Sequence, residues 1–135
     1  MLEIDVCGFL LQARLEEFRS PQTVAAFRRL LPLATQLIQA RWSGQAGWIP
    51  FGDLDLDLGP EDPVSYPAPG EILIYPGGIS ETELLFPYGH CAFGSKAGAL
   101  AGNHFATVVE GLEQLAELGR LTLWEGAQPI AFADV

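Results

Sequence analysis

The composition of this chain is that of an acidic protein rich in apolar residues. It has 135 residues, of which 49% are hydrophobic and 18% are charged, and 17 acidic against 7 basic side chains give a net charge of −10. This length predicts one domain, spanning residues 1–135, that buries a core without disulfides or metals. The few basic residues are scattered, which argues against binding to nucleic acid or to an anionic membrane surface.

Mean hydropathy, the first residues and the cysteines predict the oligomeric state and the cellular compartment. A mean hydropathy of +0.22 is high for a small protein, and it predicts a homo-oligomer, a dimer or larger, that covers part of the apolar surface. The first residues are acidic where a secretory signal is basic, and no apolar run approaches the ~20 residues of a membrane span. We therefore expect a cytoplasmic protein. Cys7 and Cys91 lack metal-ligand spacing, and free thiols are favoured over a disulfide.

Two strands and a helix are predicted first. Apolar and polar residues alternate over residues 2–6 and resume after Gly8 over residues 9–16, as in a hairpin of half-buried strands. Ser20-Pro21 then has the N-cap and first-turn residues of a helix. Apolar residues follow at helical spacing as far as Pro32. The pattern predicts one amphipathic helix over residues 21–31.

The middle of the chain is predicted as strands separated by turns. Extended segments are expected over residues 36–42, 48–51, 71–75, 83–86 and 91–93. Pro50 would place the second segment at a sheet edge, and Pro87-Tyr88-Gly89 would separate the last two. Perfect alternation over residues 53–58 predicts one more strand with a solvated acidic face. Its aspartates do not match a calcium loop, because the glycine and glutamate that such a loop needs are missing. Four prolines make residues 59–70 a loop.

A second helix is predicted near the C-terminal end of the sequence. Thr107 and Glu110 have the spacing of a capping box, and leucines follow at helical spacing. Gly119 would take the left-handed position just past the helix. Strands are expected over residues 120–124 and 130–132. Short strands joined by Gly/Pro turns dominate, so the fold class is mainly β (β-dominated α+β), a closed or nearly closed antiparallel barrel with two helices over its ends.

Several runs of sequence resemble a known family. The runs are EILIYPGGISETELLFPYG, FGSKAGALAGNHFATVVEG and ELGRLTLWEGAQPI, preceded by SPQTVAAFRRLLP and ARWSG. In this order they resemble a family of bacterial cyclophilin-like proteins of unknown function, over nearly the whole chain. The resemblance implies a cyclophilin-like closed eight-stranded antiparallel barrel with two helices. It brings no established activity, because a fold does not imply a function.

Two more distant resemblances concern activity. The order of elements is similar to that of true cyclophilins, the peptidyl-prolyl isomerases, in which a strand after the first helix carries a catalytic arginine. Arg41 occupies that place, but the residues after it, Trp42 to Gly47, depart from the isomerase pattern. A looser similarity to cucumopine-type opine synthases suggests a reaction class only. That class is the condensation of an amino acid with a keto acid without a redox cofactor.

Arg41, Trp42 and Tyr88 are candidate ligand-binding residues. A guanidinium matches the geometry of a carboxylate, and Trp42 beside it offers a flat apolar wall. Within an otherwise apolar strand Arg41 would need a counter-ion. Both a protein carboxylate and a bound anion satisfy that need. Tyr88 is a second wall or a pocket hydroxyl, although packing on the barrel also explains it.

His104 and Glu83 are candidates for proton transfer. His104 follows Asn103 and several small residues, which suggests a close approach of backbone to a ligand, although a core histidine bonded to backbone is the alternative. Glu83 and Glu125 are predicted at strand ends, where burial in a barrel mouth would raise a carboxyl pKa. Solvation is the alternative for both. Lys96, the single lysine, is expected in an exposed turn rather than as a desolvated amine.

Together these residues predict a pocket on the barrel that binds or transforms a small anionic metabolite such as a carboxylate. The expected catalytic residues are His104, Glu83 and Arg41, and the expected ligand-binding residues are Arg41, Trp42, Tyr88, Asn103 and Glu125. No cofactor or metal is expected, because no motif for either occurs. The alternatives are a peptidyl-prolyl isomerase and a non-catalytic oligomeric interaction protein.

Overall fold

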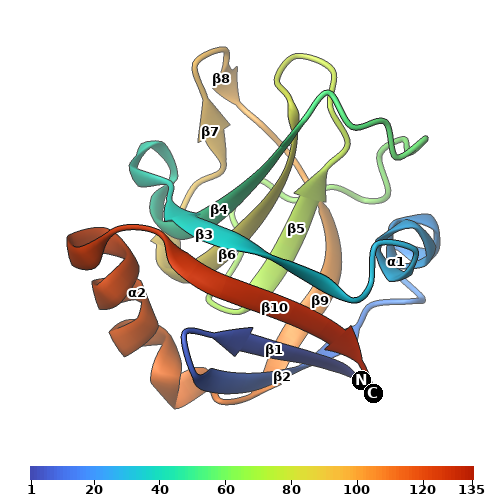
Figure 1. Ribbon diagram of the computed structural model, residues 1–135. Helices are drawn as coiled ribbons and strands as arrows, with labels where there is room; N and C mark the ends of the chain where they lie inside the picture. The colour runs from blue at the N-terminus through green and yellow to red at the C-terminus, as the bar shows by residue number, and fades with distance from the viewer.

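A closed barrel of eight antiparallel strands forms the body of the protein (Figure 1). The computed structural model describes residues 1–135. Around the barrel the strands follow the order β1-β10-β3-β4-β6-β5-β9-β2. Their bounds are β1 (Leu2–Val6), β2 (Phe9–Leu15), β3 (Leu33–Gln39), β4 (Gly44–Gly52), β5 (Glu71–Tyr75), β6 (Thr82–Cys91), β9 (Asn103–Glu110) and β10 (Gln128–Asp134). The predicted mainly-β barrel with two helices is confirmed.

Two helices and a small hairpin complete the fold. Figure 1 shows α1 and α2 on opposite sides of the barrel. None of the helices is both long and apolar enough to cross a lipid bilayer. The bounds are α1 (Pro21–Arg28), α2 (Leu115–Glu125), the 3₁₀ turns η1 (Arg41–Ser43) and η2 (Leu112–Gln114), and the hairpin strands β7 (Gly94–Ser95) and β8 (Gly98–Ala99).

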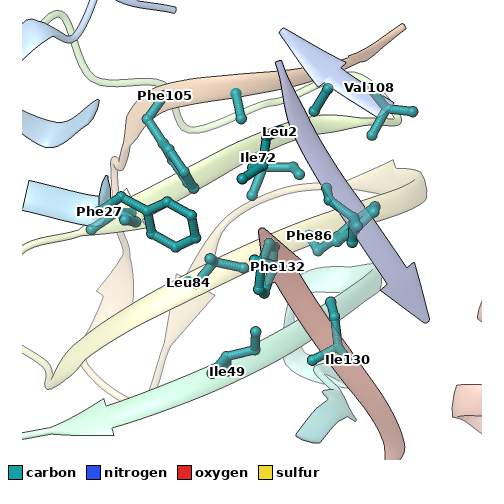
Figure 2. Packing of buried hydrophobic residues seen from close by; sticks show 14 of the residues in the cluster. Leu2, Phe27, Ile49, Ile72, Leu84, Phe86, Phe105, Val108, Ile130 and Phe132 are labelled. Atoms are coloured by element: carbon teal, nitrogen blue, oxygen red, sulfur yellow. The ribbon is translucent and has the colours of Figure 1, made fainter. Parts of the chain in front are cut away.

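The inside of the barrel is a single apolar core. It holds 23 buried residues, which come from the inward-facing positions of the strands, from both helices and, for Leu56, from the loop after β4. Phe27 of α1 reaches into it, with ring centroids 4.7 Å from Phe105 and 5.3 Å from Phe132 (Figure 2). Burying a side chain of this size contributes about 1.5–3 kcal/mol. Helix α1 therefore closes one side of the core.

A second apolar cluster lies on the outer face of the barrel and positions the candidate site. Along β5, Ile72 and Ile74 point into the core, whereas Leu73 and Tyr75 belong to the outer cluster. The chain on either side of the β7–β8 hairpin covers this cluster with Phe93 and Leu100. Strand side chains alternate between faces. The alternate residues of β6 therefore share this covered outer face.

The start of α1 differs from the predicted cap. The first hairpin is confirmed, and α1 ends at Arg28 rather than at residue 31. The Ser20 hydroxyl makes no cap hydrogen bond and is buried without a partner. Instead, the Glu61 carboxylate accepts hydrogen bonds from the backbone N–H groups of Gln22 (3.1 Å) and Thr23 (2.7 Å). A carboxylate at this position satisfies donors that a helix leaves free. The cap comes from a distant loop and so is invisible in the local sequence.

Two predictions for the middle of the chain are wrong. Residues 53–58 form a loop rather than a strand, because Gly52 (φ 63°) turns the chain and Asp57 takes a left-handed conformation (φ 55°). The Asp55 carboxylate accepts a hydrogen bond from the Asp57 N–H at 2.8 Å and supports this turn. Strand β4 is not an edge strand, since it lies between β3 and β6. Its pairing with β3 is confined to Gly47 and Trp48, however, so Pro50 faces no β3 partner and its missing N–H breaks no hydrogen bond there.

The later elements also differ from the expected ones. Strand β6 continues through Pro87-Tyr88-Gly89, which were predicted to interrupt it. The Thr107-to-Glu110 pattern is the end of β9 rather than a capping box. Gly119 and residues 120–124 lie inside α2, so no strand forms there. The cysteines are free thiols, as expected, with Cys7 half-buried and Cys91 buried.

Candidate functional site

A cavity of about 730 Å³ on the outer face of the barrel is the best candidate for a ligand site, and it is called here the Glu83 cavity. Strands β4 and β6 form its floor, the β5–β6 loop forms one side and the β7–β8 hairpin the other. Its lining residues are Trp42, Trp48, Ile79, Ser80, Glu81, Glu83, Ser95, Lys96 and Ala97. Three other surface hollows are more open, and the residues that line them include no buried carboxyl, imidazole or amine.

Glu83 is a buried carboxyl in the floor of this cavity. It is 2% exposed and lies between Pro50 of β4 and Tyr75 of β5 in the barrel register. Burial, with a smaller contribution from the charge of Glu81, raises the pKa of Glu83 from 4.5 to about 7. Its hydrogen bond from the Ser80 hydroxyl is long, at 3.4 Å. A carboxyl that titrates near neutrality can act as either proton donor or acceptor.

Two tryptophans form an aromatic corner in the cavity wall. The rings of Trp42, from η1, and Trp48, from β4, have centroids 5.1 Å apart and stand at 84° to each other. Trp42 is 52% exposed. The Trp48 indole N–H is buried without a hydrogen-bond partner, yet it lies near enough to Glu83 to favour the charged carboxylate. Such a corner suits a flat apolar group or a cation.

The rim of the cavity carries one charge of each sign. Glu81 in the β5–β6 loop and Lys96 at the tip of the β7–β8 hairpin are both exposed, and neither makes an ion pair. The Ser95 hydroxyl shapes the tip, since it donates to the Gly98 carbonyl and accepts from the Ala97 N–H, both at 3.1 Å. The exposed turn predicted for Lys96 is confirmed. Sequence reasoning missed that this turn borders the cavity.

Arg41 and Tyr88, two predicted ligand-binding residues, do not line the cavity. Arg41 lies in the turn η1 rather than in a strand, and it is exposed with no ion partner, so the expectation that it needs a counter-ion is wrong. The Tyr88 hydroxyl donates to Gln39 Oε1 at 2.7 Å. Its ring packs against Gly119 of α2. The packing alternative therefore accounts for Tyr88.

Asn103 and Glu125 also lie away from the cavity. Asn103 is fully buried, and its amide donates to Thr23 Oγ1 and to the Gly59 carbonyl, each at 3.0 Å. Its oxygen accepts from the Glu61 N–H at 2.8 Å. Asn103 thus ties the 53–70 loop to α1 and has no free polar group for a ligand. Glu125 is the exposed last residue of α2 and not the end of a strand.

His104 belongs to a separate buried network. It is 5% exposed, its Nε2 lies 2.7 Å from Thr107 Oγ1, and Thr107 donates to Glu16 Oε2 at 2.6 Å. Because the Thr107 hydroxyl already donates to Glu16, it accepts from His104, so the proton is on Nε2. Nδ1 then faces Arg19 NH1 at 3.4 Å. The predicted grouping of His104 with Glu83 in one cavity is not observed.

The buried His104 is expected to destabilise the fold in acid. Burial lowers its pKa from 6.5, although the charges of Glu71 and Glu16 oppose the shift. The unfolded chain therefore binds more protons, and stability falls as the pH drops below about 6.5. Urea denaturation at pH 7.5 and 5.5 should show that His104→Gln loses this part of the pH dependence. The exposed His90, replaced by Gln, is the matched control, and an unchanged pH dependence in His104→Gln would contradict the assignment.

The comparisons with known proteins agree with this fold. No curated protein matches the sequence. The solved structure described as "Structure of McbB in complex with tryptophan" superposes with a TM-score of 0.76 at 20% sequence identity. The match covers 98% of this chain but 44% of that one, so this chain spans less than half the length of McbB. The family described as "Protein of unknown function (DUF3830)" matches residues 2–134. The chain therefore belongs to the DUF3830 family.

Proposed function

We propose that the protein binds a small metabolite in the Glu83 cavity and that Glu83 transfers a proton to or from it. The observation that carries this proposal is the buried Glu83 carboxyl in the floor of an open cavity, with a pKa of about 7. A buried carboxyl that serves structure alone is normally paired with a basic group, whereas Glu83 has none. Costly, poorly satisfied acids are typical of functional sites.

The lining of the cavity supports a ligand with a flat apolar part and a charged part. The Trp42–Trp48 corner offers the apolar surface. Lys96 takes the role that the sequence assigned to Arg41, since it is the cation on the rim that can contact a ligand carboxylate. McbB has been solved with tryptophan bound, which supports a ligand of amino-acid size. An amino acid or a keto acid meets these requirements.

The two alternative functions have less support. Prolyl isomerisation was suggested by an arginine in a strand, and Arg41 lies in an exposed turn outside the cavity. An interaction protein without chemistry would leave the burial of Glu83 unexplained. Assembly into a homo-oligomer stays a prediction from the high mean hydropathy.

A thermal-shift screen of amino acids and keto acids tests where the ligand binds. Trp42→Ala is expected to weaken binding about tenfold, because an aromatic contact of this kind is worth 1 kcal/mol or more. The half-exposed Trp42 can be removed without opening the core. Arg41→Ala is the matched control, an exposed neighbour outside the cavity, and should bind normally. A ligand whose shift requires Arg41 and not Trp42 would contradict the proposed site.

The chemical part of the proposal is tested on the ligands found in that screen. Wild-type protein, incubated in deuterated buffer with an amino acid or an amino acid and keto acid pair, should exchange a carbon-bound hydrogen of the ligand for deuterium or form product. Glu83→Gln should abolish this at ligand concentrations that saturate both proteins, because an amide cannot accept the proton. Equal rates in the two proteins would show that Glu83 does not transfer the proton.

A further inference from the structure

We infer that the ligand of the Glu83 cavity carries a protonated amine, which binds between the Glu83 carboxylate and the faces of Trp42 and Trp48. The inference rests on the proposed function and names the chemistry of its ligand. It also departs from the sequence-based expectation, in which the ligand was an anion bound by Arg41.

The distribution of charge in the cavity favours a cationic group at the floor. Glu83 in the floor and Glu81 beside it have no basic partner. Elsewhere on the protein, acidic residues near a basic one do pair, as Glu117 does with Arg120 at 2.7 Å. The one basic residue of the lining, Lys96, lies at the tip of the hairpin and contacts neither carboxylate. A ligand ammonium would supply the missing positive charge.

The aromatic corner provides the second half of an amine site. The two indole rings pack edge to face at 84°, with centroids 5.1 Å apart, so a ligand in the cavity contacts the parts of the two rings that this packing leaves uncovered. Indole has the most favourable face of any side chain for a cation, worth about 0.5–2 kcal/mol depending on desolvation. A carboxylate next to aromatic faces therefore recognises an ammonium by charge and by shape together.

Unsatisfied hydrogen bonds at the floor indicate where the nitrogen binds. An ionised carboxylate accepts about four hydrogen bonds, and Glu83 receives one long bond from Ser80. The buried Trp48 N–H beside it has no partner. An ammonium donates three hydrogen bonds and stabilises the ionised carboxylate, which then also attracts the Trp48 N–H. The ligand ammonium thereby replaces the proton that the Glu83 carboxyl holds below its pKa.

Binding of an amine is therefore coupled to release of a proton. With a pKa of about 7, Glu83 is largely protonated at pH 6 and largely ionised at pH 8. Since the ionised fraction rises from roughly 0.1 to roughly 0.9, a ligand that binds only the carboxylate gains about tenfold in affinity over this range. A neutral or anionic ligand gains nothing from this ionisation.

Calorimetry with three indole compounds tests the inference. Tryptamine, tryptophol and indole-3-propionate share the ring and differ in the charge of the side chain. Tryptamine should bind most tightly, about tenfold more tightly at pH 8 than at pH 6. Its apparent binding heat should vary with the ionisation heat of the buffer, as proton release requires. Glu83→Gln should weaken binding and remove both dependences, while the exposed Glu3→Gln should keep them.

The other possible results contradict either the amine inference or the proposed ligand class. If tryptophol or indole-3-propionate binds as tightly as tryptamine, with no pH dependence, the amine is not the recognised group and the proposed cavity function stands. If the pH dependence persists in Glu83→Gln, another group binds the amine and the inference fails. If none of the three compounds binds at millimolar concentration, the inference fails together with the aromatic ligand class of the proposed function.

Discussion

Glu83→Gln is expected to stabilise the protein at pH 8 by up to about 3 kcal/mol, and by less than about 1 kcal/mol at pH 5. The pKa of Glu83 is about 7 in the folded protein against 4.5 for a solvated glutamate. Between these values the folded state binds more protons than the unfolded state, so ionisation of Glu83 costs stability as the pH rises through 7. Glutamine keeps the shape and removes the charge.

Urea denaturation of wild type and variant at pH 5, 7 and 8 measures this effect. The variant curve should diverge from the wild-type curve as the pH rises. Glu3→Gln is the matched control, since Glu3 is also a strand glutamate but is exposed and makes no ion pair. A variant less stable than wild type by the same amount at every pH would show that the ionised carboxylate is not penalised in the cavity.

Gly119→Ala is expected to destabilise the protein by about 2 kcal/mol, the cost of overpacking a filled site. On an ordinary helix the same change gains about 1 kcal/mol. Here a Cβ at position 119 would overlap Cδ1 and Cε1 of the Tyr88 ring. The ring is held in turn by its hydroxyl, which donates to Gln39. Helix α2 or the ring must therefore shift.

A double-mutant cycle separates the two effects. In the Tyr88→Ala background the ring is gone, so Gly119→Ala should become stabilising by about 1 kcal/mol, the ordinary helical preference. Ala116→Gly, at an exposed position in the same helix, reports that preference without the clash. If Gly119→Ala stabilises the otherwise unchanged protein, close packing of α2 on Tyr88 is ruled out.

The elements that sequence predicted well are those whose pattern depends on their own residues. The hairpin of β1 and β2 and the buried strand β5 follow from alternation and β-branched residues. The second helix was misplaced because Thr107 and Glu110 fit a capping box equally well as part of a strand. The Thr107 hydroxyl in fact bonds to His104, three residues away, and to Glu16, which is distant in sequence. Local pattern contains no information about such partners.

The candidate site was likewise predicted only in part. The sequence picked out Glu83 and Trp42, and both line the cavity. It missed Trp48 and Lys96 because the cavity is assembled by packing of the β7–β8 hairpin against the barrel, which no spacing reveals. Arg41 was favoured because it was assigned to a strand. Both residues lie in the η1 turn instead, and of the two only Trp42 lines the cavity.

The position of β10 has a consequence for how the protein is made. This strand lies between β1 and β3, with Leu2 opposite Asp134 and Thr35 opposite Ile130. A ribosome synthesises β1 and β3 long before β10, and until then each has one unpaired edge. Contacts this distant in sequence also form slowly. We therefore expect the barrel to close only after synthesis of residues 128–134, with chaperones shielding both edges in the meantime.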